Sequence, residues 1–234
     1  MKQPSTRRYR SLSGLRTTVV SCRQCPRLVK FRESVKPRAS FAGQRYWRRP
    51  VPGFGDPKAE LVVVGLAPAA HGGNRTGRVF TGDNSGRFLI KALYAAGFAN
   101  QPRSEARSDG LVYVNCYVTA AVKCAPPGDR PTREEFTECS EFLDAELKLL
   151  DHAKVVLALG SFAFRAVLDS EKRLGNRVIG AKFSHGGRYA VSGGRTLWAS
   201  YHPSPRNTNT GKLTEGMLTD LLIEIRDVLG DGRP

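Results

Sequence analysis

Two polar, glycine-rich segments carry the residues best suited to chemistry on a ligand. The segment 65–86 reads GLAPAAHGGNRTGRVFTGDNSG and combines small residues with an aromatic ring, Phe80, and a carboxylate, Asp83. The segment 202–211 reads HPSPRNTNTG, and its imidazole, hydroxyl, amide and guanidinium groups can donate to phosphate oxygens. Small residues let a backbone approach a ligand closely. Segment 65–86 matches neither a P-loop nor a dinucleotide-binding fingerprint.

The cysteines suggest a metal site. Cys22 and Cys25 have C-x2-C spacing, and fourteen residues separate Cys124 from Cys139. Five cysteines without a visible signal peptide argue against a disulfide framework. Four thiolates suit zinc or a [4Fe–4S] cluster, and the wide second pair favours iron–sulfur over a zinc ribbon. Ordinary buried thiols are the alternative for Cys139, and the expectation for Cys116.

Charge points to a polyanionic partner. The chain has 37 Lys and Arg against 21 Asp and Glu, a net charge of +16, and residues 1–50 supply 14 basic residues and one acid. Such a field favours nucleic acid as the partner over the two alternatives, a solvated basic arm or an arginine-rich codon bias. No run of about 18 apolar residues and no signal peptide is visible, so we expect a cytoplasmic protein, nucleoid-associated when bound to DNA, with no membrane partner.

Short apolar runs alternate with amphipathic ones, which predicts a parallel sheet covered on both faces. Ligands bind such sheets beyond the carboxyl ends of the strands. We expect a basic N-terminal extension over 1–20, a single domain over 21–234, and a long loop over 37–58. The expected strands are 60–65, 111–118, 154–159 and 196–201, and the expected helices are 28–35, 85–98, 132–150, 161–168 and 214–229.

The two glycine-rich segments, the motif CAPPGDRP and the four clustered cysteines together resemble the family 5 (type B) uracil-DNA glycosylases, relatives of the iron–sulfur family 4 enzymes. The resemblance spans roughly residues 20–230. It implies a three-layer α/β/α sandwich around a four-stranded, mostly parallel sheet. It also implies a structural [4Fe–4S] cluster on Cys22, Cys25, Cys124 and Cys139.

The same resemblance implies a monofunctional DNA glycosylase of base excision repair. Such an enzyme flips out uracil, or another damaged base such as hypoxanthine, and hydrolyses the N-glycosidic bond to leave an abasic site. Phe80 matches the family's stacking ring, and His202 matches the histidine that binds the base O2. Asp83 is the matching catalytic carboxylate, with Asp129 of CAPPGDRP as the second candidate. Relatives commonly have Asn at position 129, and a turn-closing role is equally expected there.

The base pocket departs from sister families at two places. Several of them carry a polar residue inside the G-x-x-P motif, where this chain has Leu66 and Ala67. Family 4 enzymes often read the uracil edge with an Asn after the second strand, where this chain has Ala120. We expect Gly65, Ala67, Phe80 and Ala120 to contact the base, and a pocket without that amide to accept a broader range of bases.

The remaining polar residues of the motifs are expected to hold DNA, double- or single-stranded, as a monomer. The basic arm with Arg7, Arg8 and Arg10 would add non-specific affinity, and His185 could reach DNA or close a turn. The expected DNA-binding residues are His71, Asn74, Arg75, Ser204, Arg206, Asn207 and Asn209.

Two other functional classes fit part of the pattern. A non-catalytic nucleic-acid-binding protein stapled by a metal site of four cysteines would explain the charge and the cysteines, but not the two glycine-rich segments. A small-molecule α/β hydrolase would leave the charge unexplained, and the chain lacks G-x-S-x-G.

Overall fold

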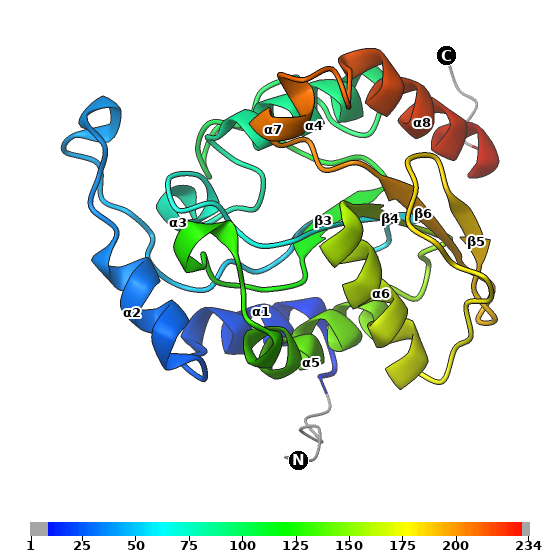
Figure 1. Ribbon diagram of the computed structural model, residues 1–234, viewed down its shortest axis with the longest axis horizontal. Helices are drawn as coiled ribbons and strands as arrows, with labels where there is room; N and C mark the ends of the chain where they lie inside the picture. The colour runs from blue at the N-terminus through cyan, green and yellow to red at the C-terminus, as the bar shows by residue number, and fades with distance from the viewer. Residues whose placement is uncertain (1–8, 231–234) are drawn as a thin grey trace.

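A single sheet runs through the molecule, and helices lie on both of its faces (Figure 1). The structure is a computed structural model, and it describes residues 9–230. Its helices are α1 (Leu12–Ser21), α2 (Pro26–Ser34), α3 (Gly73–Thr76), α4 (Asn84–Ala95), α5 (Arg133–Leu149), α6 (Ser161–Arg173), α7 (Pro205–Thr208) and α8 (Glu215–Val228), with 3-10 turns η1 (Ala39–Phe41) and η2 (Pro127–Asp129). Its strands are β1 (Phe54–Gly55), β2 (Leu61–Gly65), β3 (Cys116–Ala120), β4 (Val155–Leu159), β5 (Arg188–Ala190) and β6 (Thr196–Ser200).

The sheet has the order β1-β3-β2-β4-β6-β5. The central strands β3, β2, β4 and β6 are parallel, which confirms the predicted mostly parallel sheet. The antiparallel edge strands β1 and β5 were not predicted, because two and three residues are too few to show a period. The second strand is Cys116–Ala120 rather than 111–118, because Val112 and Val114 are exposed while every residue of β3 is buried.

Two cores fill the space between the sheet and its helices. On one face α4 and α8 pack against each other and against the sheet, burying Leu89, Leu93 and Leu222. On the other face α5 and α6 cover the sheet with Leu143 and Phe164 (Figure 1). These layers confirm the predicted α/β/α sandwich. The helices over residues 9–230 are all too short or too polar to cross a bilayer.

The segment expected to be a basic extension contains a helix. Ser11 caps α1 by accepting from the N–H of Gly14, and Leu15 and Val19 are buried. Helix α1 packs against α5, so this part of the chain belongs to the folded body. Arg10 is exposed, whereas Arg7 and Arg8 lie outside the described residues.

Candidate active site

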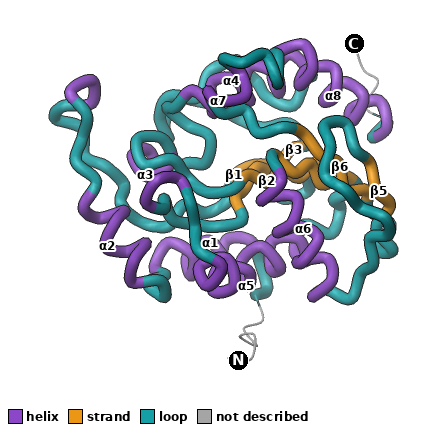
Figure 2. The backbone as a smooth tube through the Cα atoms, in the orientation of Figure 1, coloured by secondary structure: helices purple, strands orange, loops and turns teal. Residues whose placement is uncertain are grey.

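Loops gather at the carboxyl edge of the central strands, where Figure 2 shows long stretches without regular structure. Strands β2 and β3 end side by side, with Gly65 opposite Ala120. The chain after β3 continues this pairing, because the N–H groups of Ala121 and Val122 donate to the carbonyls of Gly65 and Leu66 at 2.9 Å each. Regular pairing therefore holds the first residues beyond both strands in register.

Phe80 lies directly against the end of β2. A Cβ atom on Gly65 would come within 2.6 Å of Phe80 Cζ, so only glycine leaves room for the ring. Phe80 itself has a positive φ of 49°, a left-handed conformation that is uncommon for a residue other than glycine. The half-buried ring lies 6.2 Å from the His202 ring, tilted by 35°. The two residues expected to contact the base thus face one another.

His202 opens the loop that follows β6. Asn207 Nδ2 donates to the His202 carbonyl at 2.8 Å and so closes this loop beneath the imidazole. Burial lowers the pKa of His202 to about 4. The imidazole is therefore neutral near pH 7, and its N–H can donate a hydrogen bond without carrying a positive charge.

A cavity of about 510 Å³ lies beside His202, within the usual range for a ligand pocket. Its wall includes Leu66, Tyr201 and the start of α6 at Gly160 and Ser161. Gly160 is the N-cap of α6 and offers no side-chain hydrogen bond, so the first N–H groups of the helix are available to an anion. Gly160 and Ser161 were not expected at the site, although a glycine between the run KVVLAL and a helix was a usable signal.

Asp83, the candidate catalytic carboxylate, also has a structural role. It is the N-cap of α4, where its Oδ1 accepts from the N–H of Gly86 at 2.8 Å. Its Oδ2 fills the place of a side chain at Gly72, because a Cβ there would lie 1.8 Å away. Burial raises the pKa of Asp83, backbone N–H groups of Gly86 and Ser85 oppose that effect, and the charge of Asp129 adds to it.

Asp129 is exposed at the end of η2, with a left-handed φ of 56°. Its charge is felt by both Asp83 and His71, so the two candidate carboxylates belong to one electrostatic neighbourhood. Neither carboxylate is in the wall of the 510 Å³ cavity, which lies on the His202 side of the site.

The four clustered cysteines line one small cavity between α2, the segment after β3 and α5. Nη1 of the buried Arg32 donates to Cys124 Sγ at 2.9 Å, and the N–H of Lys123 donates to Cys139 Sγ at 3.2 Å. Burial raises the pKa of the Cys25 thiol to about 12 and that of Cys124 to about 11.

All five cysteines are free thiols, and Cys116 is an ordinary core residue on the other face of the sheet, as predicted. Within residues 9–230, no group of three or more His, Cys, Asp or Glu side chains is arranged to hold a metal ion. Four cysteines from three chain segments nevertheless line the cavity, together with Glu138, and N–H donors are aimed at two of the sulfurs. These residues fit a thiolate-bound group whose charge is offset by hydrogen bonds.

Comparisons with known proteins agree with this geometry. The family model for the uracil DNA glycosylase superfamily matches residues 52–226. The chain belongs to the uracil-DNA glycosylase superfamily. It is 48% identical to a type-5 uracil-DNA glycosylase of Thermus thermophilus, over 91% of this chain and 96% of the relative. It is 52% identical to one of Pyrobaculum aerophilum, over 87% of both chains, and 45% identical to one of Mycobacterium leprae, over 94% and 96%.

Two residues of this superfamily member that were expected on the DNA surface are engaged inside the protein. Asn74 is buried, with Nδ2 donating to the Arg32 carbonyl at 3.1 Å, and this contradicts its predicted contact with DNA. Arg75 is half-buried and donates to the carbonyls of His71 and Gly82 at 2.8 and 3.1 Å. Polar residues in a glycine-rich loop resemble DNA contacts in sequence, but loops also need internal donors for their carbonyls.

The other expected DNA-binding residues divide in the same way. Arg206 and Asn209 are exposed, and Ser204 and Arg206 line the cavity beside His202. Asn207 instead closes the His202 loop. His185 stacks on Tyr201, with ring centroids 5.3 Å apart, and this contact favours the structural alternative for that residue.

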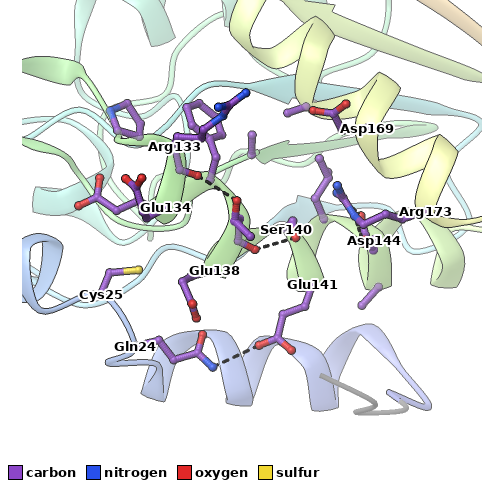
Figure 3. Close-up of a pocket in the computed structure, with 18 of the residues that line it drawn as sticks. Gln24, Cys25, Arg133, Glu134, Glu138, Ser140, Glu141, Asp144, Asp169 and Arg173 are labelled. Carbon is purple, nitrogen blue, oxygen red and sulfur yellow. Dashed lines mark hydrogen bonds and ion pairs between the residues drawn. The ribbon is translucent and has the colours of Figure 1, made fainter. Parts of the chain in front are cut away.

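A broad groove runs along α5 and α6 (Figure 3). Six acidic and six basic side chains line it, so its charges balance. Among these side chains, Arg27 forms a salt bridge with Glu135 and Arg173 forms one with Asp144. The groove therefore lacks the positive field that DNA requires, and the candidate active site is at the strand ends, around Phe80 and His202.

Proposed function

We propose that this uracil-DNA glycosylase is monofunctional: it extrudes the damaged nucleotide, hydrolyses the bond between base and deoxyribose, and leaves an abasic site. The function in base excision repair follows from the family. The observation that carries the rest is the approach of the Phe80 ring, which lies against Gly65, to the His202 ring at 6.2 Å. This arrangement supplies a stacking face and a hydrogen-bond donor to one planar ring.

The chemistry assigned to these groups follows the charge that develops. A base inside a duplex cannot be reached, so the nucleotide must leave the stack, and the Phe80 face then stabilises it by about 1–3 kcal/mol. When the bond to C1′ breaks, the electron pair leaves with the base and charge collects on O2. The neutral His202 donates to that oxygen, and one such donor is worth about 3 kcal/mol.

Asp83 serves the sugar that remains. A carboxylate stabilises the oxocarbenium-like ion and orients the water that adds to C1′. Burial makes the ionised form of Asp83 costly and so raises its pKa. A positive charge developing on the sugar would therefore be a favourable partner for this carboxylate. Asp129, exposed at the rim, is the second candidate for orienting the water.

A hydrolytic route suits the lysines near the site. The buried Lys123 Nζ contacts Glu146 Oε2 at 2.6 Å and Thr119 Oγ1 at 2.7 Å, so it is not free to attack a sugar. Lys212 lies over the Tyr201 ring at 4.7 Å, at the wall of the cavity. Lys123 therefore does not supply the free amine that lyase chemistry requires, and we propose that Lys212, held over the Tyr201 ring, does not act as one.

The range of bases should be broader than uracil alone. Ala120 ends β3 opposite Gly65 and has no amide to read the edge of the base. Strong selectivity needs polar groups that a wrong ligand would leave unpaired. We therefore propose that hypoxanthine and related damaged bases are also released.

The thiol-lined cavity would hold a [4Fe–4S] cluster on Cys22, Cys25, Cys124 and Cys139. The bound cluster would supply a covalent staple rather than a redox step. The cluster would tie the segment between α1 and α2 to the segment after β3 and to α5. Ala67, in the loop that follows β2, packs on the same core as the cysteines. We further propose that the enzyme acts as a monomer in the cytoplasm, at the nucleoid, on double- or single-stranded DNA.

A panel of oligonucleotides carrying uracil, hypoxanthine or an undamaged base tests the proposal. The wild type should leave alkali-labile sites at uracil and hypoxanthine, whereas His202→Ala and Asp83→Ala should bind DNA but turn over slowly. Asp83→Asn separates charge from capping, because an Asn oxygen can still accept from the N–H of Gly86. An Asp83→Asn enzyme of undiminished rate would refute the choice of carboxylate, and activity confined to uracil would refute the broad range.

A further inference from the structure

A strongly basic loop projects from the body beyond α2. It is defined here as residues 36–49, and Figure 1 shows it as the blue segment that extends past α2 and α3. The sequence KPRASFAGQRYWRR holds five cations and no acid. All five cations are exposed. The field around this loop is therefore uniformly positive.

Three of these cations have side chains that no other group of the described residues engages. The side chains of Lys36, Arg38 and Arg45 make no hydrogen bond or ion pair within residues 9–230. Arg48, in contrast, donates to the Val35 carbonyl at 3.1 Å, and Arg49 lies 5.8 Å from the centre of the Trp47 ring. The three cations without partners thus precede residue 46, whereas the residues that follow contact the rest of the protein.

The base of the loop is fastened to the catalytic segment, residues 71–83. The N–H groups of Trp47 and Arg48 donate to the carbonyls of Arg75 and Asn74 at 2.9 and 3.1 Å. The Tyr46 hydroxyl and His71 Nδ1 are hydrogen-bonded at 2.9 Å. The loop is therefore held alongside the residues that lead to Asp83.

One guanidinium joins the loop to both ends of that segment. Arg75 Nη1 donates to Gln44 Oε1 at 3.0 Å, and the guanidinium carbon lies 4.0 Å from the centre of the Phe41 ring. Its other nitrogens donate to the carbonyls of His71 and Gly82. A displacement of the loop must therefore move Arg75, and with it the residue before Asp83.

We propose that the basic loop is a second DNA-binding element, which grips backbone phosphates beside the extruded nucleotide, and that Arg75 is a positioning residue linking this grip to Asp83. The proposal deepens the proposed function, because it assumes that the catalytic segment acts on DNA. Phosphates are the chemistry that matches three exposed cations that form no ion pair with a carboxylate of the described residues.

The salt dependence of DNA binding tests the grip. In the variant Lys36→Gln/Arg38→Gln/Arg45→Gln, the slope of log K against log salt for duplex DNA should fall by about 2 to 3, since each lost phosphate contact removes about 0.9. KM for uracil DNA should also rise. The matched control is Lys58→Gln/Lys148→Gln/Lys172→Gln, which removes the same charge from exposed lysines. Lys58 lies just before β2, and Lys148 and Lys172 lie at the ends of α5 and α6.

An unchanged slope in the loop variant, or an equal fall in the control, would overturn the proposal. Binding is measured separately from excision, so a wild type that binds DNA but releases no base would refute the proposed function and leave the grip standing. The link is tested with Arg75→Met, which should lower kcat and leave the salt slope unchanged. A fall of about 1 in that slope would show that Arg75 touches phosphate instead.

Discussion

Replacing Gly65 with alanine tests whether the Phe80 ring must rest against the end of β2. The new Cβ would lie 2.6 Å from Phe80 Cζ and 2.7 Å from Cε2. Carbon atoms in contact prefer about 3.5–4.0 Å, so the ring must retreat by about 1 Å. Overpacking of this kind lowers the free energy of unfolding by roughly 1–3 kcal/mol.

The displaced ring should also cost activity. Stacking of a base on an aromatic face is worth about 1–3 kcal/mol, which corresponds to roughly 5- to 150-fold in kcat/KM. We expect the Gly65→Ala enzyme to lie within this range. Thermal unfolding and single-turnover release of uracil from an oligonucleotide give the two numbers separately.

A double-mutant cycle identifies the ring as the target. Once Phe80→Ala removes the ring, adding Gly65→Ala should cost little more stability and no further rate. The control Gly216→Ala places a Cβ no closer than 3.9 Å to any neighbour, and it should leave excision unchanged. If the effects of Gly65→Ala and Phe80→Ala on the rate multiply, or if folded Gly65→Ala excises uracil like the wild type, the reasoning fails.

Three further predictions concern a proton, the base pocket and the cysteines. The His202 ring should titrate near pH 4 by NMR. The unfolded chain binds that proton at higher pH, so stability should fall between about pH 6.5 and 4, and less so in His202→Gln. Ala120→Asn should narrow release toward uracil, and unaltered hypoxanthine release would contradict this. Arg32→Gln should speed loss of iron absorbance near 400 nm, whereas the exposed Arg23→Gln should not.

The sequence was sufficient to predict elements whose pattern is local. Apolar runs such as ELVVVG marked the four central strands, and Thr132 with Glu135 forms a capping box where the expected helix 132–150 begins. Gly65 at the end of β2 was expected to let a ligand approach the backbone, and in the structure it is the Phe80 ring that lies against it. These features depend on neighbours within a few residues, so the sequence carries them directly.

Features that depend on distant partners were predicted poorly. Asn74 was expected to contact DNA because it lies in a polar stretch of the sequence, but its amide donates to the carbonyl of Arg32, 42 residues away on α2. Arg75 was expected to do the same, and its partner Gln44 lies 31 residues away. Helix α1 was not predicted because only two of its ten residues, Leu15 and Val19, are buried. Tertiary contacts decide such residues, and no local period reports them.

The two centres of this glycosylase meet at Arg32. Its guanidinium donates to Cys124 Sγ and to the Cys22 carbonyl, while its own carbonyl accepts from Asn74 Nδ2 in the catalytic segment. A group bound by the cysteines would therefore fix α2, and α2 supports the loop that leads to Asp83. Because a displacement of about 1 Å in an active site can cost 100-fold in rate, a metal centre need not transfer electrons to matter for catalysis. If the group has such a role, its loss should lower both the free energy of unfolding and kcat. The affinity for DNA, which we propose the basic loop supports, should be retained.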